Sequence, residues 1–135
     1  MLCSTVLDLI DIIFYCLQGE LMTEIRLMYW KEIPAQVQAK DKNGLVSQPL
    51  DPRFQEGIDA ISMFDGSSGT DEYLDAWNWG KFIEVKEPAN EAALTFANRI
   101  NQGFPSDFVV RIRDLHKSGK RNPNPGAIDS WVLDK

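Results

Sequence analysis

The residue pair Asn43-Gly44 is the feature that most limits what this chain can fold into. Both residues tolerate the positive φ angles of a type I′ turn, whose twist matches that of two antiparallel strands. Residues 35–40 before the pair alternate between apolar and polar side chains, and residues 45–48 after it have the composition of a return strand. The pair therefore predicts a β-hairpin within an antiparallel sheet.

Two further strands are expected on either side of this hairpin. Residues 24–30 alternate with a period of two and carry aromatic and β-branched side chains, which favour a strand that ends near Pro34 or has Pro34 at an edge. Residues 82–85 predict a fourth strand. The short links between the first three strands favour antiparallel pairing.

Helices are predicted from capping residues and from the spacing of apolar side chains. Asp51 and Pro52 begin a helix whose buried stripe is Phe54, Ile58, Ile61 and Phe64. Thr70 is expected to cap a short helix that runs through Trp77 and ends at Gly80, Pro88 begins a helix with Gly103 as its C-cap, and Ser106 caps a last helix that ends at Gly119. These elements predict an α+β fold, in which helices pack on one face of a small antiparallel sheet of three to four strands.

The first 21 residues differ in composition from the rest of the chain. They contain Asp8, Asp11 and Glu20 and no basic residue, and their longest uncharged run is far shorter than the ~20 residues that cross a bilayer. As a helix this segment is amphipathic. Three interpretations stay open: a helix that packs on the domain or on a second copy, upstream sequence that precedes a start at Met22, or a helix on a membrane surface, which the acidic residues disfavour.

The chain is expected to consist of one domain with an extension at each end. Residues 1–21 are the N-terminal extension, residues 22–119 the α+β domain, and residues 120–135 an irregular C-terminal tail rich in proline and asparagine. We expect residues 22–135 to fold alone, and Trp131 and Val132 to dock back on the domain.

The charge and the scarcity of ligating residues exclude several functions. The chain of 135 residues has 20 acidic and 14 basic residues, and this excess of negative charge disfavours a nucleic-acid partner. Cys3, Cys16 and His116 are too few and too far apart for a structural zinc site, so we expect no metal and no cofactor. Two thiols without a disulfide pattern are typical of a reducing compartment.

The sequence shows no arrangement of residues typical of catalysis. The glycine-rich loop at residues 66–70 lacks the lysine of a phosphate-binding loop, and His116 has no evident nucleophile or orienting partner. An acidic stretch at residues 51–75 and a basic stretch at residues 111–121 suit docking onto a charged partner or a second copy.

The aromatic run Tyr73, Trp77 and Trp79 is the least ordinary feature of the chain. The helix spacing places Trp77 in the core, on one stripe with Tyr73, and places Trp79 nearer the surface. Tryptophan and tyrosine are common in binding hot spots, so these residues are candidates for a partner or ligand surface.

Three short motifs resemble a known family. They are Tyr29-Trp30-Lys31-Glu32-Ile33-Pro34-Ala35-Gln36-Val37, then Arg53-Phe54-Gln55-Glu56 with Ile58-Asp59, then Gly69-Thr70-Asp71 with Tyr73-Leu74 and Trp77-x-Trp79. In this order the motifs, within residues 24–118, resemble the small bacterial "virulence factor" domain family. A related module forms part of conserved virulence factor C proteins. The resemblance implies a bacterial, cytoplasmic protein with no established reaction, and it supplies no catalytic residues.

Two functions follow as hypotheses. The first is a non-catalytic accessory or protein-interaction domain whose partner is another protein or a second copy of the chain. The alternative is a small enzyme or small-ligand-binding protein with a pocket around Arg53, Tyr73 and Trp77, the ligand being unknown. Trp79 is included among the candidate binding residues in either case.

Overall fold

The structure is a computed structural model that describes residues 22–132. The predicted N-terminal helix within residues 1–21, and residues 133–135, lie outside the described residues. Within the described part of the chain, no helix is both long enough and apolar enough to cross a membrane.

The sheet has five antiparallel strands, and the first three are the ones expected from the sequence. The strands are β1 Thr23–Trp30, β2 Ile33–Asp41, β3 Gly44–Pro49, β4 Trp77–Trp79 and β5 Ile83–Val85. Their order is β3-β2-β1-β4. The strand β5 also pairs with β1, at residues 23–25, whereas β4 pairs with residues 28–30. The predicted hairpin is confirmed, because Asp41 pairs with Gly44. The predicted type I′ turn at Asn43-Gly44 is wrong: the turn is Lys42-Asn43, Asn43 does not have a positive φ angle, and Gly44, with a φ angle of +140°, is already the first residue of β3.

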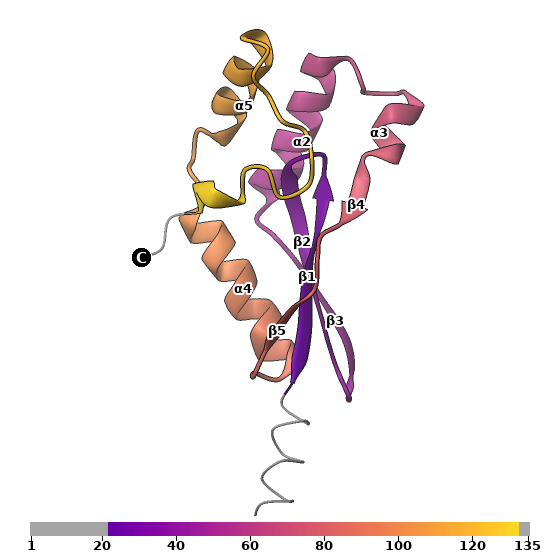
Figure 1. Ribbon diagram of the computed structural model, residues 1–135, viewed down its shortest axis with the longest axis vertical. Helices are drawn as coiled ribbons and strands as arrows, with labels where there is room; N and C mark the ends of the chain where they lie inside the picture. The colour runs from indigo at the N-terminus through magenta and orange to yellow at the C-terminus, as the bar shows by residue number, and fades with distance from the viewer. Residues whose placement is uncertain (1–21, 133–135) are drawn as a thin grey trace, which may run out of the picture.

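Within residues 22–132, four α-helices and a 3₁₀ helix complete the α+β fold. They are α2 Pro52–Asp65, α3 Asp71–Asp75, α4 Ala89–Gly103, α5 Phe108–Lys117 and η1 Asp129–Trp131. In Figure 1, α4 lies along the sheet, whereas α2 and α5 lie toward the end at which β1 turns into β2. The C-terminal segment then returns from α5 past the top of β1 to η1 (Figure 1).

One face of the sheet and the inner faces of the helices form a single core. The sheet contributes the buried side chains of Ile25, Leu27 and Val37 to this core. The helix α4 contributes those of Ala93 and Ala97. Small side chains on α4 allow the helix to lie close to the strands. The opposite side of β1 carries Arg26 and Met28, which are only partly buried.

The predicted short helix from Thr70 through Trp77 to Gly80 is wrong in its second half. The helix α3 ends at Asp75, and Trp77–Trp79 form β4, which pairs with Met28–Trp30 of β1. Main-chain pairing with β1 overrides a helix here, because the open edge of β1 offers hydrogen-bond partners that a continued helix would leave unused. The four-residue spacing of Tyr73 and Trp77 did not distinguish these two outcomes.

Several predicted helix details are also wrong. Asp51 and Thr70 make no side-chain capping bond; the Thr70 hydroxyl donates instead to the Ser67 carbonyl. Phe64 does not continue the buried stripe of α2, because its side chain is 37% exposed near the helix end. The last helix begins after Asp107 rather than Ser106.

The C-terminal segment packs against the domain. Ile128 is buried in the core cluster, and Trp131 and Val132 pack against it. The ring of Trp131 lies 6.3 Å from that of Phe104, measured between centroids.

Candidate functional site

The edge of the sheet between β4 and β5 is interrupted by an extra residue. Between the pairs Met28–Trp79 and Ile25–Ile83, two residues of β1 oppose the three residues 80–82. This arrangement is a β-bulge, which turns side chains away from the regular pattern. The Gly80 amide still donates to the Leu27 carbonyl at 2.8 Å.

Gly80 is required at this bulge because the ring of Tyr29 lies against it. A Cβ atom at Gly80 would be 2.7 Å from Cε2 of Tyr29, which is closer than such atoms approach in proteins. The absence of a side chain therefore lets the tyrosine ring lie across the edge of the sheet.

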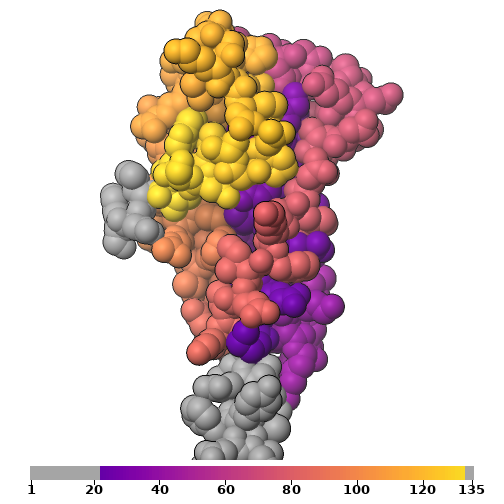
Figure 2. Space-filling view, viewed as in Figure 1, coloured from indigo at the N-terminus to yellow at the C-terminus, as the bar shows by residue number. Residues whose placement is uncertain are grey.

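A hollow of about 680 Å³ opens beside this bulge. Its lining comes from β1, the β4–β5 segment, α4 and the C-terminal segment: Ile25, Arg26, Leu27, Tyr29, Trp79, Gly80, Lys81, Phe82, Ile83, Phe96, Pro125, Gly126 and Asp129. In Figure 2 the C-terminal segment, in yellow, lies above the β5 region, in salmon, on the face toward the viewer. The volume lies within the range of ligand-binding pockets.

Arg26 is held at the rim of the hollow by three side chains. The carbon of its guanidinium group lies 3.9 Å from the ring centroid of Trp79 and 4.7 Å from that of Phe82. Its Nε donates to Oε1 of Gln38 at 2.7 Å. We call Arg26, Gln38, Trp79 and Phe82 the arginine cluster. Stacking and a hydrogen bond together hold the guanidinium plane in one orientation.

Apolar surface remains uncovered beside the arginine cluster. The side chain of Phe82 is 48% exposed and that of Ile83 is 51% exposed. Two large apolar neighbours at a sheet edge beside a stacked arginine have the composition of a binding hot spot.

The lining of the hollow includes a hydrogen bond between distant parts of the chain. The Tyr29 hydroxyl donates to Oδ2 of Asp129 at 2.7 Å. Burial, and then the adjacent Asp129 carboxylate, raise the pKa of Tyr29 well above its usual range. Tyr29 therefore stays protonated at neutral pH and serves as a donor that ties η1 to β1.

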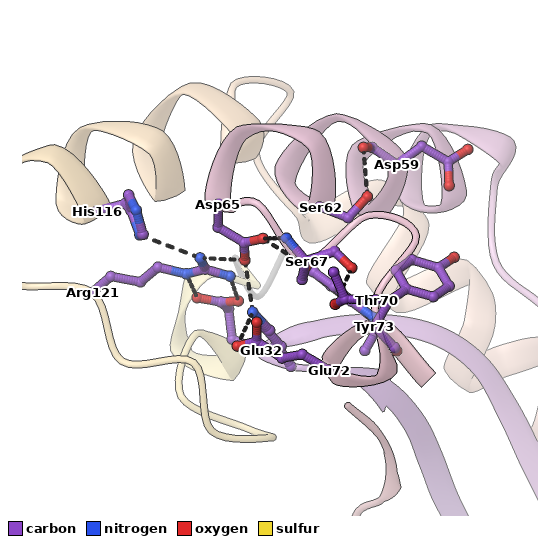
Figure 3. Close-up of polar contacts among 12 residues, drawn as sticks. Glu32, Asp59, Ser62, Asp65, Ser67, Thr70, Glu72, Tyr73, His116 and Arg121 are labelled. Atoms are coloured by element: carbon purple, nitrogen blue, oxygen red, sulfur yellow. Dashed lines mark hydrogen bonds and ion pairs between the residues drawn. The ribbon is translucent and has the colours of Figure 1, made fainter. Parts of the chain in front are cut away.

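A second charged cluster lies at the turn between β1 and β2. Arg121 donates to Glu32 at 2.7 and 2.8 Å and to Asp65 at 3.0 Å, and Nζ of Lys31 lies 2.7 Å from Asp65. Figure 3 shows Glu32, Asp65 and Arg121 converging from the turn, the end of α2 and the C-terminal segment. We call Lys31, Glu32, Asp65 and Arg121 the ionic network.

The charged groups of the ionic network are paired with one another, and Nζ of Lys31 also lies 3.4 Å from Oε1 of the exposed Glu72. Burial alone would raise the pKa of Asp65, but hydrogen bonds from Lys31, Ser67 and Arg121 outweigh burial and lower this pKa to about 2. Burial likewise opposes the charge of Arg121, but Glu32 and then Asp65 outweigh it and raise its pKa. Throughout residues 22–132, every buried side-chain nitrogen and oxygen has a hydrogen-bond partner. These ion pairs hold the β1–β2 turn, the end of α2 and the C-terminal segment together.

Arg53, which the sequence grouped with Tyr73 and Trp77, is hydrogen-bonded to main-chain carbonyls. Arg53 donates to the carbonyls of Asn101, Phe104 and Pro105, so its guanidinium group closes the C-terminal end of α4. That carbonyl-binding role was not apparent from the sequence, since its three partners follow about 50 residues later.

Tyr73 and Trp77 do lie together. Their rings are 6.2 Å apart between centroids in an edge-to-face arrangement, and the Tyr73 carbonyl accepts a hydrogen bond from Nε1 of Trp30. Trp77 packs against the core and also lines a shallow hollow of about 390 Å³ beside Met28. Trp79 lies two residues further along β4, in the arginine cluster.

Several residues of these clusters were missed from the sequence. Arg26 occupies an outward position of a predicted strand, where a charged side chain is ordinary. Glu32 offered the better signal, because it is a lone acid between Trp30 and Ile33, and its side chain is 1% exposed. No local pattern indicated its partner, Arg121, which is 89 residues away.

Among residues 22–132, no three His, Cys, Asp or Glu side chains are placed to hold a metal ion. The fold and its hollow thus define a small α+β domain with an antiparallel sheet, a helix along one face and an arginine–aromatic cluster at one edge.

The comparison with protein families agrees with the resemblance seen in the sequence. The family model described as "Virulence factor" matches residues 28–112, which is more than half of the chain. The chain therefore belongs to the virulence factor family. Neither the curated proteins nor the solved structures include a match to it.

Proposed function

We propose that this chain is a non-catalytic accessory domain of the bacterial cytoplasm that binds another protein through the hollow between β4 and β5. The observation that carries the proposal is the arginine cluster, in which Arg26 is stacked between Trp79 and the half-exposed Phe82. Tryptophan and arginine dominate binding hot spots because they combine a large apolar contact with directed hydrogen bonds.

The contrast with the ionic network supports a binding role over a catalytic one. A catalytic acid or base must be able to exchange a proton with a substrate, whereas the charged groups of the network are hydrogen-bonded to one another. The alternative pocket around Arg53, Tyr73 and Trp77 has weaker support, since Arg53 already donates to three carbonyls.

Affinity capture with matched variants tests this proposal. The immobilised full chain is compared with Trp79→Ala and with Asn78→Ala, a substitution of the exposed neighbour in the same strand. We expect Trp79→Ala to reduce capture of the partner at least about tenfold, as loss of a hot spot does, while Asn78→Ala leaves it unchanged.

Thermal unfolding of each variant shows whether a loss of capture comes from a loss of fold. Repeated capture experiments that return no specific partner would count against the proposal. So would equal losses from both substitutions. Light scattering of the purified chain distinguishes a second copy as the partner, which would replace the proposed heterologous protein.

A further inference from the structure

We infer that the hollow recognises a carboxylate carried on an apolar segment of the partner protein, with Arg26 as its receptor. This inference rests on the proposed binding role of the hollow and adds the chemistry of the partner. Three observations carry it: the fixed orientation of Arg26, the charges around the hollow, and its apolar lining.

The first observation is that Arg26 is oriented but not satisfied. Its Nε donates to Gln38, and its plane lies against Trp79 and Phe82. Within residues 22–132, the terminal nitrogens of Arg26 make no hydrogen bond, unlike those of Arg121. A guanidinium group that is already fixed loses little further freedom when a carboxylate binds to its terminal N–H groups.

The second observation is the local excess of positive charge in an acidic chain. The hollow is lined by Arg26 and Lys81 against the single acid Asp129, which already accepts the Tyr29 hydroxyl. Glu24 and Glu84 pair across β1 and β5 next to this hollow without lining it. These neighbouring acids favour a single negative charge over a phosphate dianion, because repulsion grows with the charge of the ligand.

The third observation is the apolar surface on which the carrier of the carboxylate would lie. Phe82, Ile83 and Phe96 line the hollow, and about half of the surface of Phe82 and of Ile83 is uncovered. A small hydrophilic anion would leave this surface wet, whereas leucine-like side chains would cover it. The fitting partner is therefore a peptide segment in which a carboxylate adjoins apolar residues.

The carboxylate has two possible sources within a peptide, namely an acidic side chain or the chain end. Two pairs of probes distinguish them. The first pair is acetyl-Leu-Asp-Leu-amide and its Asn counterpart, and the second is acetyl-Leu-Leu-Leu with a free carboxylate and the same peptide as an amide. Each probe is titrated into the ¹⁵N-labelled full chain, and the amides of Gly80 and Lys81 and the indole N–H of Trp79 are followed.

We expect at least one charged probe to bind at least about tenfold more tightly than its neutral counterpart, with shifts confined to the hollow. Discrimination within the first pair alone assigns the carboxylate to a side chain, and discrimination within the second pair alone assigns it to a chain end. Arg26→Gln should abolish the discrimination, and Arg26→Lys should retain only part of it, because lysine keeps the charge without the planar fork. Arg113→Gln, at an exposed position of α5, is the matched control and should leave the discrimination between charged and neutral probes intact.

Dispersed spectra of the Arg26 variants establish that they are folded. Equal binding of charged and neutral probes would overturn the inference, as would discrimination that survives Arg26→Gln. Tighter binding of a phosphoserine probe than of the Asp probe would overturn the choice of a carboxylate. If no probe binds while Trp79→Ala still abolishes capture of a protein partner, the carboxylate inference fails and the proposed interaction surface stands.

Discussion

Arg121 and Arg26 belong to the same small domain and use the same side-chain chemistry in opposite ways. The guanidinium group of Arg121 is nearly buried and donates to two carboxylates from two other segments. The guanidinium group of Arg26 is partly exposed, stacks on two rings and makes one hydrogen bond to a neutral amide.

The comparison shows how pairing distinguishes a structural charge from one that is available to a partner. At Arg121 the cost of burying a cation is offset by charge-assisted hydrogen bonds. The ionic network thereby joins α2, the β1–β2 turn and the C-terminal segment. At Arg26 the guanidinium group is partly exposed, and within the described domain only its Nε makes a hydrogen bond. The predictions below test this difference.

The largest effect is expected from removal of Arg121. Arg121→Ala leaves the Glu32 carboxylate, which is 1% exposed, without its cation. Loss of one partner of a buried ion pair costs about 3–5 kcal/mol, so the free energy of unfolding in urea should fall by that amount. Arg26→Ala, the same substitution in the partly exposed arginine cluster, removes cation–π contacts rather than an ion pair and should cost about 1 kcal/mol.

A double substitution checks the cause of this loss. Arg121→Met combined with Glu32→Leu removes the charge left unpaired in Arg121→Ala and fills the space with apolar atoms. Much of the lost stability should therefore return. Similar stabilities for Arg121→Ala and Arg26→Ala would contradict the distinction between the two arginines.

The next effect concerns the two tryptophans of β4. Trp77 packs against the core and the ring of Tyr73, so Trp77→Ala should cost about 1–3 kcal/mol, less than emptying a fully buried site. Trp79 stacks on Arg26 in the arginine cluster, and its loss should cost about 1 kcal/mol or less. Thermal and urea unfolding of both variants measure this order. An equal loss of several kcal/mol from each would place Trp79 in the core as well.

A smaller effect is expected from the titration of Asp65. Its pKa in the folded chain is about 2, below the usual value of 3.8, so the charged carboxylate stabilises the fold above about pH 4. That contribution is lost as the pH falls from about 4 toward 2, because the unfolded chain then takes up the proton more readily. Asp65→Asn should lose less stability than the natural chain between pH 4 and 2, measured by urea unfolding. Asp59→Asn, an exposed position on α2, should keep the natural slope.

The smallest effect is expected from removal of residues 1–21. The arginine cluster, the ionic network and the described core lie within residues 22–132. Residues 22–135 should therefore unfold cooperatively, with little change in the midpoint of unfolding. Calorimetry of the full chain and the truncated chain gives the comparison. Loss of a cooperative transition would show that the first residues complete the core.

The parts of the fold that were predicted correctly depend on local patterns. The alternation in residues 24–30 and 35–40 placed β1 and β2, the hairpin signal placed β3 although the turn itself is Lys42-Asn43, and the stripe Phe54, Ile58 and Ile61 placed the buried side of α2. Such patterns report which side of an element is buried, since side-chain direction follows directly from the period of the backbone.

The candidate site was predicted only in part, because its members meet through tertiary contacts. Trp79 was named from its residue type, but its neighbour Arg26 comes from β1, more than 50 residues earlier in the chain. Arg53 was named for its charge, whereas its use is set by carbonyls at the end of α4. Neither the contact of Trp79 with Arg26 nor that of Arg53 with the end of α4 produces a periodic pattern in the sequence.

The sequence by itself determined the hairpin, the helix and strand class of most segments, and the family of the chain, because these depend on neighbouring residues. Only the tertiary structure decided that Trp77–Trp79 form a strand, since the edge of β1 supplies the hydrogen bonds that hold them there. The tertiary structure also decided which charged side chains are paired within the domain and which keep hydrogen-bonding groups for a partner. Glu32 meets Arg121 across 89 residues, and the favourable energy of such a contact exists only once the chain between them has folded.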